Sequence, residues 1–186
     1  MVAQDIRHTG EVDLPTLRDG DLVLRPMRPA DADAITAACQ DPEIPRWTFV
    51  PSPYTRADAE QFIARVAEEV AAGTTVNLLA VDASDDHLLG SFGLMEIDRE
   101  RGSGEIGYWV AADARGRGIA SRATRLLADW ARAELGLTRL EILPHKDNEP
   151  SRRVAENAGF RDTGEVVSAP RAPVGEPVFA VYVWDA

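Results

Sequence analysis

The stretch EIGYWVAADARGRGIASRATRLLADWARAEL, residues 105–135, decides the fold of this 186-residue chain. Its first six residues, 105–110, are mostly aromatic and β-branched, as is typical of a strand. From 118 to 135 the apolar residues recur at helical spacing, and Gly136 follows as a stop. A second strand is expected at 138–143. The whole unit is therefore predicted to be a right-handed crossover between two parallel strands.

The segments on either side predict further strands and helices around this crossover. The segment 41–54 contains four prolines and is predicted to be irregular. The helix after it is expected to begin at a capping box, Thr55 to Asp58, and to stop at Gly73. Strands are predicted at 21–28, 75–82, 88–97, 162–168 and 177–184, and the other helices at 30–40 and 149–157. Antiparallel hairpins in the middle of the chain complete a mixed α/β sheet covered by helices.

Length and composition predict a single domain over residues 1–186, with a polar, frayed start at 1–12. Hydrophobic residues make up 45% and charged residues 27% of the chain, which is ordinary for a soluble protein. There is no apolar run long enough for a membrane span and no apolar signal segment, so a cytoplasmic protein without a membrane partner is expected. One cysteine, Cys39, excludes an internal disulfide, and three scattered histidines give no metal-ligand spacing, so no metal is expected.

The charge balance also limits the partners. A net charge of −11 argues against a nucleic acid, whose phosphates need a basic surface. It favours a cationic acceptor such as an amine or a basic polypeptide, although solubility alone explains such a charge as well. Lys146 is the only lysine, so a P-loop or a Schiff-base mechanism would have to depend on that one residue.

The loop from Arg115 to Ala120 is the strongest candidate site. Gly116 and Gly118 lie where a strand passes into a long helix, whose first turn offers unpaired N–H groups and a positive dipole end. Arg115 and Arg117 add positive charge that suits phosphate oxygens. The spacing does not fit a Rossmann fingerprint, and the Gly-Lys-Ser/Thr of a P-loop is absent. A glycine turn that serves geometry alone remains the alternative.

Three ordered motifs resemble the GCN5-related N-acetyltransferase (GNAT) family, and the likeness runs from about Leu22 to Trp184. The family's signature, Arg/Gln-x-x-Gly-x-Gly/Ala, matches Arg115-x-x-Gly118-x-Ala120. The flanking motifs resemble the branch that acetylates ribosomal-protein N-termini, and they are Gly107-Tyr108-Trp109-Val110, Asn148-x-x-Ser151 and Ala158-Gly159-Phe160.

The resemblance implies a largely antiparallel sheet of six to seven strands with one splayed parallel pair, flanked by about four helices. It implies an acetyl-CoA-dependent enzyme that moves the acetyl group to a primary amine, a protein α-amine or a small molecule, by direct attack in a ternary complex. A homodimer is a further expectation, since dimers are common in the family. The cofactor residues carried over are Trp109, Val110, Arg115, Gly116, Arg117, Gly118, Ile119, Ala120 and Asn148, with Asn148 equally suited to a plain helix cap.

Three residues are candidates for the catalytic steps. Ser151 matches the position that donates to the departing sulfur, or it only begins a helix. Glu105 and Glu96 are the candidate bases, and proximity to the cleft favours Glu105. The alternative for each is a solvated strand carboxylate or the partner of an arginine. Trp47, Phe49 and Tyr54, together with the loop 169–177, are expected to wall the acceptor pocket, unless these aromatics form only the small core of their own loop.

Two other functions remain open from the sequence. The first is a non-catalytic acyl-CoA-binding module that uses the same loop for regulation. The second is a structural or partner-binding protein whose glycines serve only turn geometry.

Overall fold

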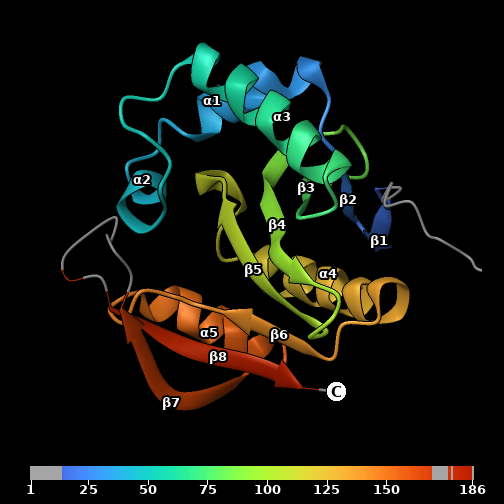
Figure 1. Ribbon diagram of the computed structural model, residues 1–186. Coiled ribbons are helices and arrows are strands. Elements are labelled where there is room, and N and C mark those ends of the chain that lie inside the picture. Colours follow the sequence, from blue (N-terminus) through green and yellow to red (C-terminus); the bar gives the residue numbers. More distant parts are fainter. Residues whose placement is uncertain (1–13, 169–175, 177, 186) are drawn as a thin grey trace, which may run out of the picture.

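The computed structural model describes residues 14–168, 176 and 178–185, and these residues form one eight-stranded sheet with helices on both faces (Figure 1). The strand order is β1-β2-β3-β4-β5-β6-β8-β7. The strands are β1 Leu17–Asp19, β2 Leu22–Pro26, β3 Val76–Asp82, β4 Leu88–Asp98, β5 Ser103–Val110, β6 Arg139–Ile142, β7 Arg161–Ser168 and β8 Val178–Asp185. The helices are α1 Ala32–Ala38, α2 Glu43–Trp47, α3 Arg56–Ala71, α4 Ile119–Leu135 and α5 Glu149–Asn157, with short 3-10 turns at Pro29–Asp31 and Ala112–Ala114.

The predicted crossover is confirmed, and it divides the sheet. The β5–β6 pair is parallel, and every other neighbouring pair is antiparallel. The parallel pairing covers only Ser103–Glu105 against Arg139–Glu141, whereas β5 runs on to Val110. Beyond Glu105 the two strands therefore diverge, and the edge of β5 that faces β6 keeps unpaired backbone groups.

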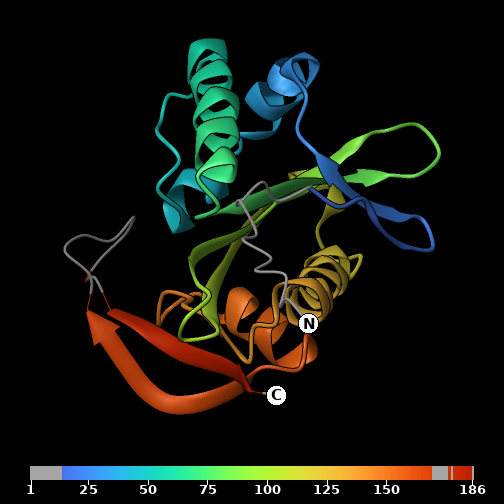
Figure 2. The same cartoon turned by 45° about the vertical axis from the view of Figure 1, so that its right-hand side comes forward.

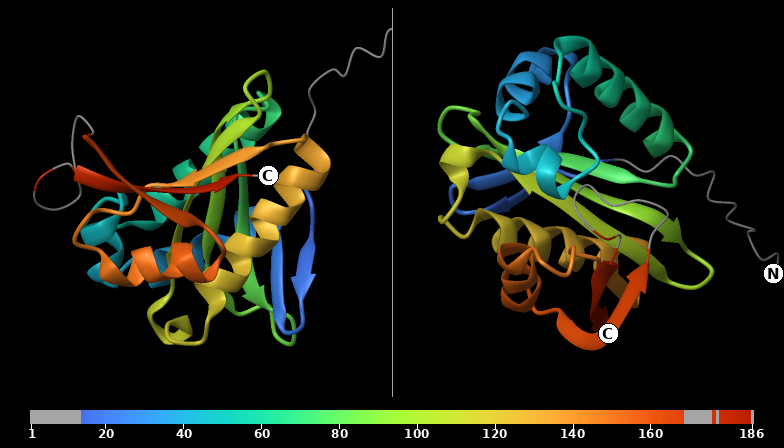
Figure 3. Two further views of the ribbon diagram at one scale, coloured as in Figure 1. Left: turned by 90° about the horizontal axis from the view of Figure 1, so that it is seen from below. Right: turned by 90° about the vertical axis from the view of Figure 1, so that its left-hand side faces the viewer.

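Helices α1 and α3 cover one face of the sheet, and α4 and α5 cover the other (Figures 2 and 3). Each face has its own buried cluster, because strand side chains alternate between faces. Helix α4 contributes a stripe at every fourth position, namely Ile119, Ala123, Leu127 and Ala131, each at most 2% exposed. This stripe fixes the direction in which the start of α4 points.

The predicted helix ends are confirmed at both long helices. Thr55 and Asp58 form a reciprocal capping box, in which the Asp58 carboxylate accepts the Thr55 N–H at 2.8 Å. Gly73 follows α3 with a φ of 72°, and Gly136 ends α4 with a φ of 68°. Both are left-handed conformations that favour glycine.

Three local predictions were wrong. The segment 41–54 holds a short helix, α2, because Pro45 falls in its first turn, where no intrahelical N–H is needed. An eighth strand, β1, pairs with β2 through a tight turn, and three residues are too few to give a periodic pattern. The first strand ends at Pro26 rather than at 28, because Pro29 starts a 3-10 turn. The expectation for residues 1–12 lies outside the described residues.

Candidate active site

A cleft of about 1310 Å³ opens where β5 and β6 diverge. Its walls come from both halves of the sheet: α2 and α3 on one side, and the beginnings of α4 and α5 on the other. Residues from nearly every predicted motif line it, so the fold gathers them although they are up to about a hundred positions apart. The list includes Trp47, Phe49, Tyr54, Glu96, Glu105, Trp109, Val110, Arg115, Gly116, Gly118, Ile119, Ala120, Asn148 and Ser151.

The glycine loop forms the mouth of the cleft at the start of α4. Gly116 and Gly118 have φ values of 74° and 73°, and Gly118 is the N-cap of the helix. A Cβ added at either glycine would have no described atom within 4 Å, so open space lies in front of the backbone there. The N–H groups of the first turn, from Ile119 onward, lack intrahelical partners. This combination fits a pyrophosphate, which needs backbone donors and close approach.

The two arginines of the loop behave differently. Arg115 donates from Nε and Nη2 to the carbonyl oxygen of Val110 at 3.2 and 3.1 Å, and its guanidinium also forms an ion pair with Asp41. Arg117 lies 3.8 Å from the carboxylate of Asp82, a loose surface pair. Arg115 therefore ties the loop to the segment that precedes α2, and it lines the cleft, whereas Arg117 is not among the lining residues.

The end of β5 offers backbone rather than side chains to a cofactor. The Trp109 side chain is 9% exposed and packs in the cluster beneath α1 and α3. The Val110 carbonyl already accepts the Arg115 side chain. The unpaired edge of β5 that faces β6 has free polar groups of the kind that would bond the amides of a pantetheine arm.

Asn148 and Ser151 lie at the start of α5, across the cleft from that edge. Asn148 is the N-cap, and its Oδ1 accepts the Ser151 N–H at 3.2 Å, so the capping role is observed. The Ser151 Oγ lies 2.8 Å from the phenol oxygen of Tyr108. Helix α5 carries no tyrosine, so the hydroxyl that meets Ser151 comes from a strand.

Tyr108 is the residue that sequence reasoning missed. It lies on β5, stacks on Phe92 with ring centroids 5.4 Å apart, and burial raises the pKa of its phenol to about 12. The alternation of side chains along the strand could have indicated the position of Tyr108. Alternation puts Tyr108 on the face opposite Glu105, and there it packs against the cluster that contains residues of α4 and α5.

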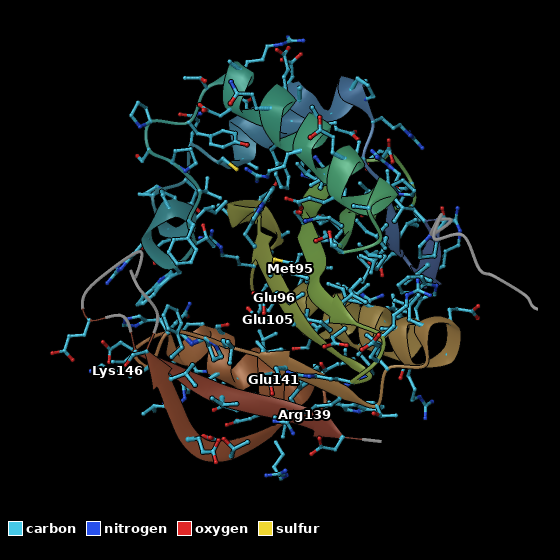
Figure 4. All side chains as sticks on the ribbon, in the orientation of Figure 1. Met95, Glu96, Glu105, Arg139, Glu141 and Lys146 are labelled. Carbon is cyan, nitrogen blue, oxygen red and sulfur yellow. The ribbon has the colours of Figure 1, made fainter. Side chains whose placement is uncertain are left out.

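Three carboxylates cluster on the other face of β5 (Figure 4). Glu105 is paired in register with Met95 of β4 and with Glu141 of β6. Burial, reinforced by the negative charges of Glu96 and Glu141, raises the pKa of Glu105 to about 7. Arg139 holds Glu141, with 2.7 Å between nitrogen and oxygen. A carboxyl poised near neutrality beside a cleft is a candidate general base.

Simple alternation fails at Glu96. The residue adopts a φ of 50°, and the β4–β5 register shifts between Met95 and Asp98. This bulge turns the side chain, and the charge of Glu96 acts on Glu105 as a result. Glu96 therefore belongs to the same cluster as the preferred base.

The three predicted acceptor aromatics all reach the cleft, but in different ways. Tyr54 is 8% exposed and belongs to the core beneath α1 and α3, whereas Phe49 is 53% exposed. Trp47 donates from Nε1 to Glu43 at 3.1 Å, and its ring lies 5.7 Å from that of His145. His145, which was not predicted, links α2 to the opposite wall through Phe179. Of the loop 169–177, only Glu176 is among the described residues.

Neither a metal-binding cluster nor a membrane-spanning helix is found in the part of the chain that the structure describes. No group of three or more histidine, cysteine or acidic side chains there could hold a metal ion. No helix there is long and apolar enough to cross a membrane.

Comparison with known proteins agrees with this geometry. Residues 21–161 match the family described as Acetyltransferase (GNAT) domain. The uncharacterized N-acetyltransferase p20 of Bacillus licheniformis is 28% identical over 152 residues, which is 81% of this chain and 85% of that protein. Mycobacterium smegmatis RimJ in complex with CoA-disulfide superposes with a TM-score of 0.81 at 22% identity, covering 93% of this chain and 87% of that one. The ribosomal-protein-S5-alanine acetyltransferase of Vibrio fischeri gives 0.80 at 18%, covering 92% and 96%.

Proposed function

Because the chain belongs to the GNAT family of acetyltransferases, we propose that it moves the acetyl group of acetyl-CoA to a primary amine by direct attack in a ternary complex. The observation that carries this proposal is the arrangement of the cleft. The Glu105 carboxyl, with a pKa near neutrality, and the hydroxyl pair of Tyr108 and Ser151 both line the cleft. Glu105 and Tyr108 lie on opposite faces of β5. When bound, acetyl-CoA supplies an acetyl group on a thiol of pKa ~8.5, a fair leaving group.

The cofactor is proposed to lie on the α4–α5 side of the cleft. The N–H groups from Arg117 to Ala120 would surround the pyrophosphate, and the unpaired edge of β5 would bond the pantetheine arm. A backbone N–H of the same edge would polarise the acyl carbonyl as an oxyanion-type donor.

Glu105 is the proposed general base. It would take a proton from the ammonium group of the acceptor, directly or through a water molecule, and so form the neutral amine that attacks. An α-amine has a pKa of ~7.7–8.0 and a lysine side chain one of ~10.4. A carboxyl with a pKa of about 7 is nearly matched to the first, but it is about three units below the second. The cluster therefore favours an α-amine or another weakly basic amine as acceptor.

The acceptor is proposed to be the N-terminus of a protein or peptide. The name of the Vibrio fischeri relative refers to a ribosomal protein and its alanine. In this chain Trp47 and Phe49 line the side of the cleft from which such a chain would enter, and Glu96 and Glu141 add negative charge that would attract an ammonium group.

Turnover with a panel of acceptors tests this proposal. Peptides with free and blocked N-termini, and small amines, are incubated with acetyl-CoA, and thiol release is measured. Release with free but not blocked peptides supports the proposal. CoA binding by calorimetry without release from any acceptor would support the non-catalytic module instead, and absence of CoA binding would overturn both.

A further inference from the structure

The contact between the Tyr108 and Ser151 side chains joins β5 to α5. Tyr108 comes from β5 and Ser151 from the first turn of α5, and their side-chain oxygens lie 2.8 Å apart. Both residues line the cleft. Either hydroxyl could in principle be the donor, so the direction of this bond has to be argued from its surroundings.

The surroundings of Tyr108 decide that direction. Its phenol has one other acceptor within reach among the described residues, the Ser151 carbonyl at 3.5 Å, which is at the limit of a hydrogen bond. If Ser151 donated to Tyr108, the buried phenol proton would be left with that poor partner alone, at a cost in free energy. If Tyr108 donates, its proton is satisfied and the Ser151 hydroxyl keeps its own proton for another acceptor.

We propose that Tyr108 is a positioning residue that donates to the Ser151 oxygen and thereby turns the Ser151 hydroxyl proton into the cleft. The inference rests on the proposed function and on the role that the family resemblance implies for Ser151, namely a hydrogen bond to the departing sulfur. It assigns to a strand residue the task of aiming and polarising a hydroxyl on a helix.

The atoms balance without a proton leaving Tyr108. The bond from the acyl carbon to the amine nitrogen forms, the bond from that carbon to sulfur breaks, and its electron pair goes to sulfur. Glu105 takes one proton from the ammonium group, and the neutral amine that results attacks the acyl carbon. The nitrogen loses its second proton to solvent as the carbon–sulfur bond breaks. The Ser151 hydroxyl stabilises the thiolate, which then takes a proton from solvent. The phenol, with its pKa raised to about 12, stays protonated beside a thiol of pKa ~8.5, so it donates a hydrogen bond rather than a proton.

The pKa of the thiol of bound CoA is the decisive readout, because it needs no turnover. Ultraviolet absorbance of the thiolate is titrated in complexes of CoA with the unchanged protein, Tyr108→Phe, Ser151→Ala and the double variant. We expect the thiol pKa to rise in both single variants, less in Tyr108→Phe, and the double variant to match Ser151→Ala. In turnover, Tyr108→Phe should lower kcat about fivefold to twentyfold with KM for acetyl-CoA within about twofold.

Tyr182→Phe is the matched control. It also removes a buried phenol hydroxyl, but one that contacts Arg152 and Glu156 rather than Ser151, so it should leave the thiol pKa unchanged. The inference would be overturned if the thiol pKa in Tyr108→Phe equalled that in the unchanged protein. Additive effects of the two substitutions in the double variant would overturn it as well. In that case turnover by the unchanged protein would still support the proposed function, whereas absence of CoA binding would overturn that function itself.

Discussion

At Glu105, burial and two neighbouring negative charges act in the same direction on one carboxyl. Both favour its neutral form, so the pKa rises to about 7. A general base must be ionised, so kcat/KM is expected to rise with pH and to level off above a midpoint near 7. Glu105→Gln should lower kcat/KM by roughly 10²–10⁴-fold and remove that step. A profile of kcat/KM against pH for both proteins checks this, and an unchanged step in the variant would exclude Glu105 as the base.

Glu141 offers a finer test at the same scale. Its charge helps to raise the pKa of Glu105, so removing that charge in Glu141→Gln should lower the pKa and move the midpoint of kcat/KM to lower pH. Glu68→Gln is the control, because it removes the same negative charge from an exposed side chain of α3 outside the cleft. It should leave the midpoint of the kcat/KM profile unchanged. A shift to higher pH in Glu141→Gln would contradict the arrangement of the cluster.

Individual residues of the site could be predicted from the sequence where a motif carried them. Ser151, Asn148 and the loop 115–120 follow from the motifs that resemble the GNAT family, and of these residues only Arg117 is not among those that line the cleft. Glu141 and Tyr108 could not be found in that way. Their partners, Glu105 and Ser151, are 36 and 43 positions away, and the contacts depend on the register of a parallel pair and on the direction in which α5 packs.

At the scale of elements, long periodic segments were predictable and short irregular ones were not. Helix α4 carries its apolar stripe over 17 residues and ends at a glycine, so its pattern is unambiguous. Helix α2 has five residues, and its prolines favour a loop until their place in the first turn is known. The bulge at Glu96 interrupts the strand alternation from which the facing of a side chain is predicted. No residue type at this position indicates the bulge.

The two ends of α4 allow a matched test of the glycine loop. Gly118 and Gly136 both have left-handed φ values, and both face open space among the described residues, so alanine at either should cost a similar amount of stability, ~1 kcal/mol. Only Gly118→Ala alters the backbone that would meet the pyrophosphate. CoA affinity by calorimetry should therefore fall in Gly118→Ala and stay unchanged in Gly136→Ala. Equal affinity in the two variants would assign Gly118 to turn geometry alone.

At the scale of the whole molecule, the two halves of the sheet are joined by three parallel residue pairs. Because the cleft lies at this junction, its two walls are held by contacts from both halves. Arg115 joins the glycine loop to Asp41 before α2, and Trp47 meets His145 before α5. One buried cluster contains residues of both halves, such as Leu24 of β2 and Tyr182 of β8, so close packing holds the two walls together beside the cleft.

The net charge of −11 acts on the two substrates in opposite ways. It would attract a cationic peptide and repel the anionic cofactor, and salt screens both effects, with a Debye length of ~10 Å at 0.1 M. Raising the salt concentration from about 0.05 to about 0.3 M should therefore raise KM for a peptide rich in basic residues, while KM for acetyl-CoA stays constant or falls. Initial rates are measured at both salt concentrations with two peptides that share their first residue but differ in net charge. The comparison separates long-range attraction by the protein's negative charge from recognition of the first residue in the cleft. If the neutral and basic peptides respond alike, the acidic surface serves solubility and does not steer the acceptor.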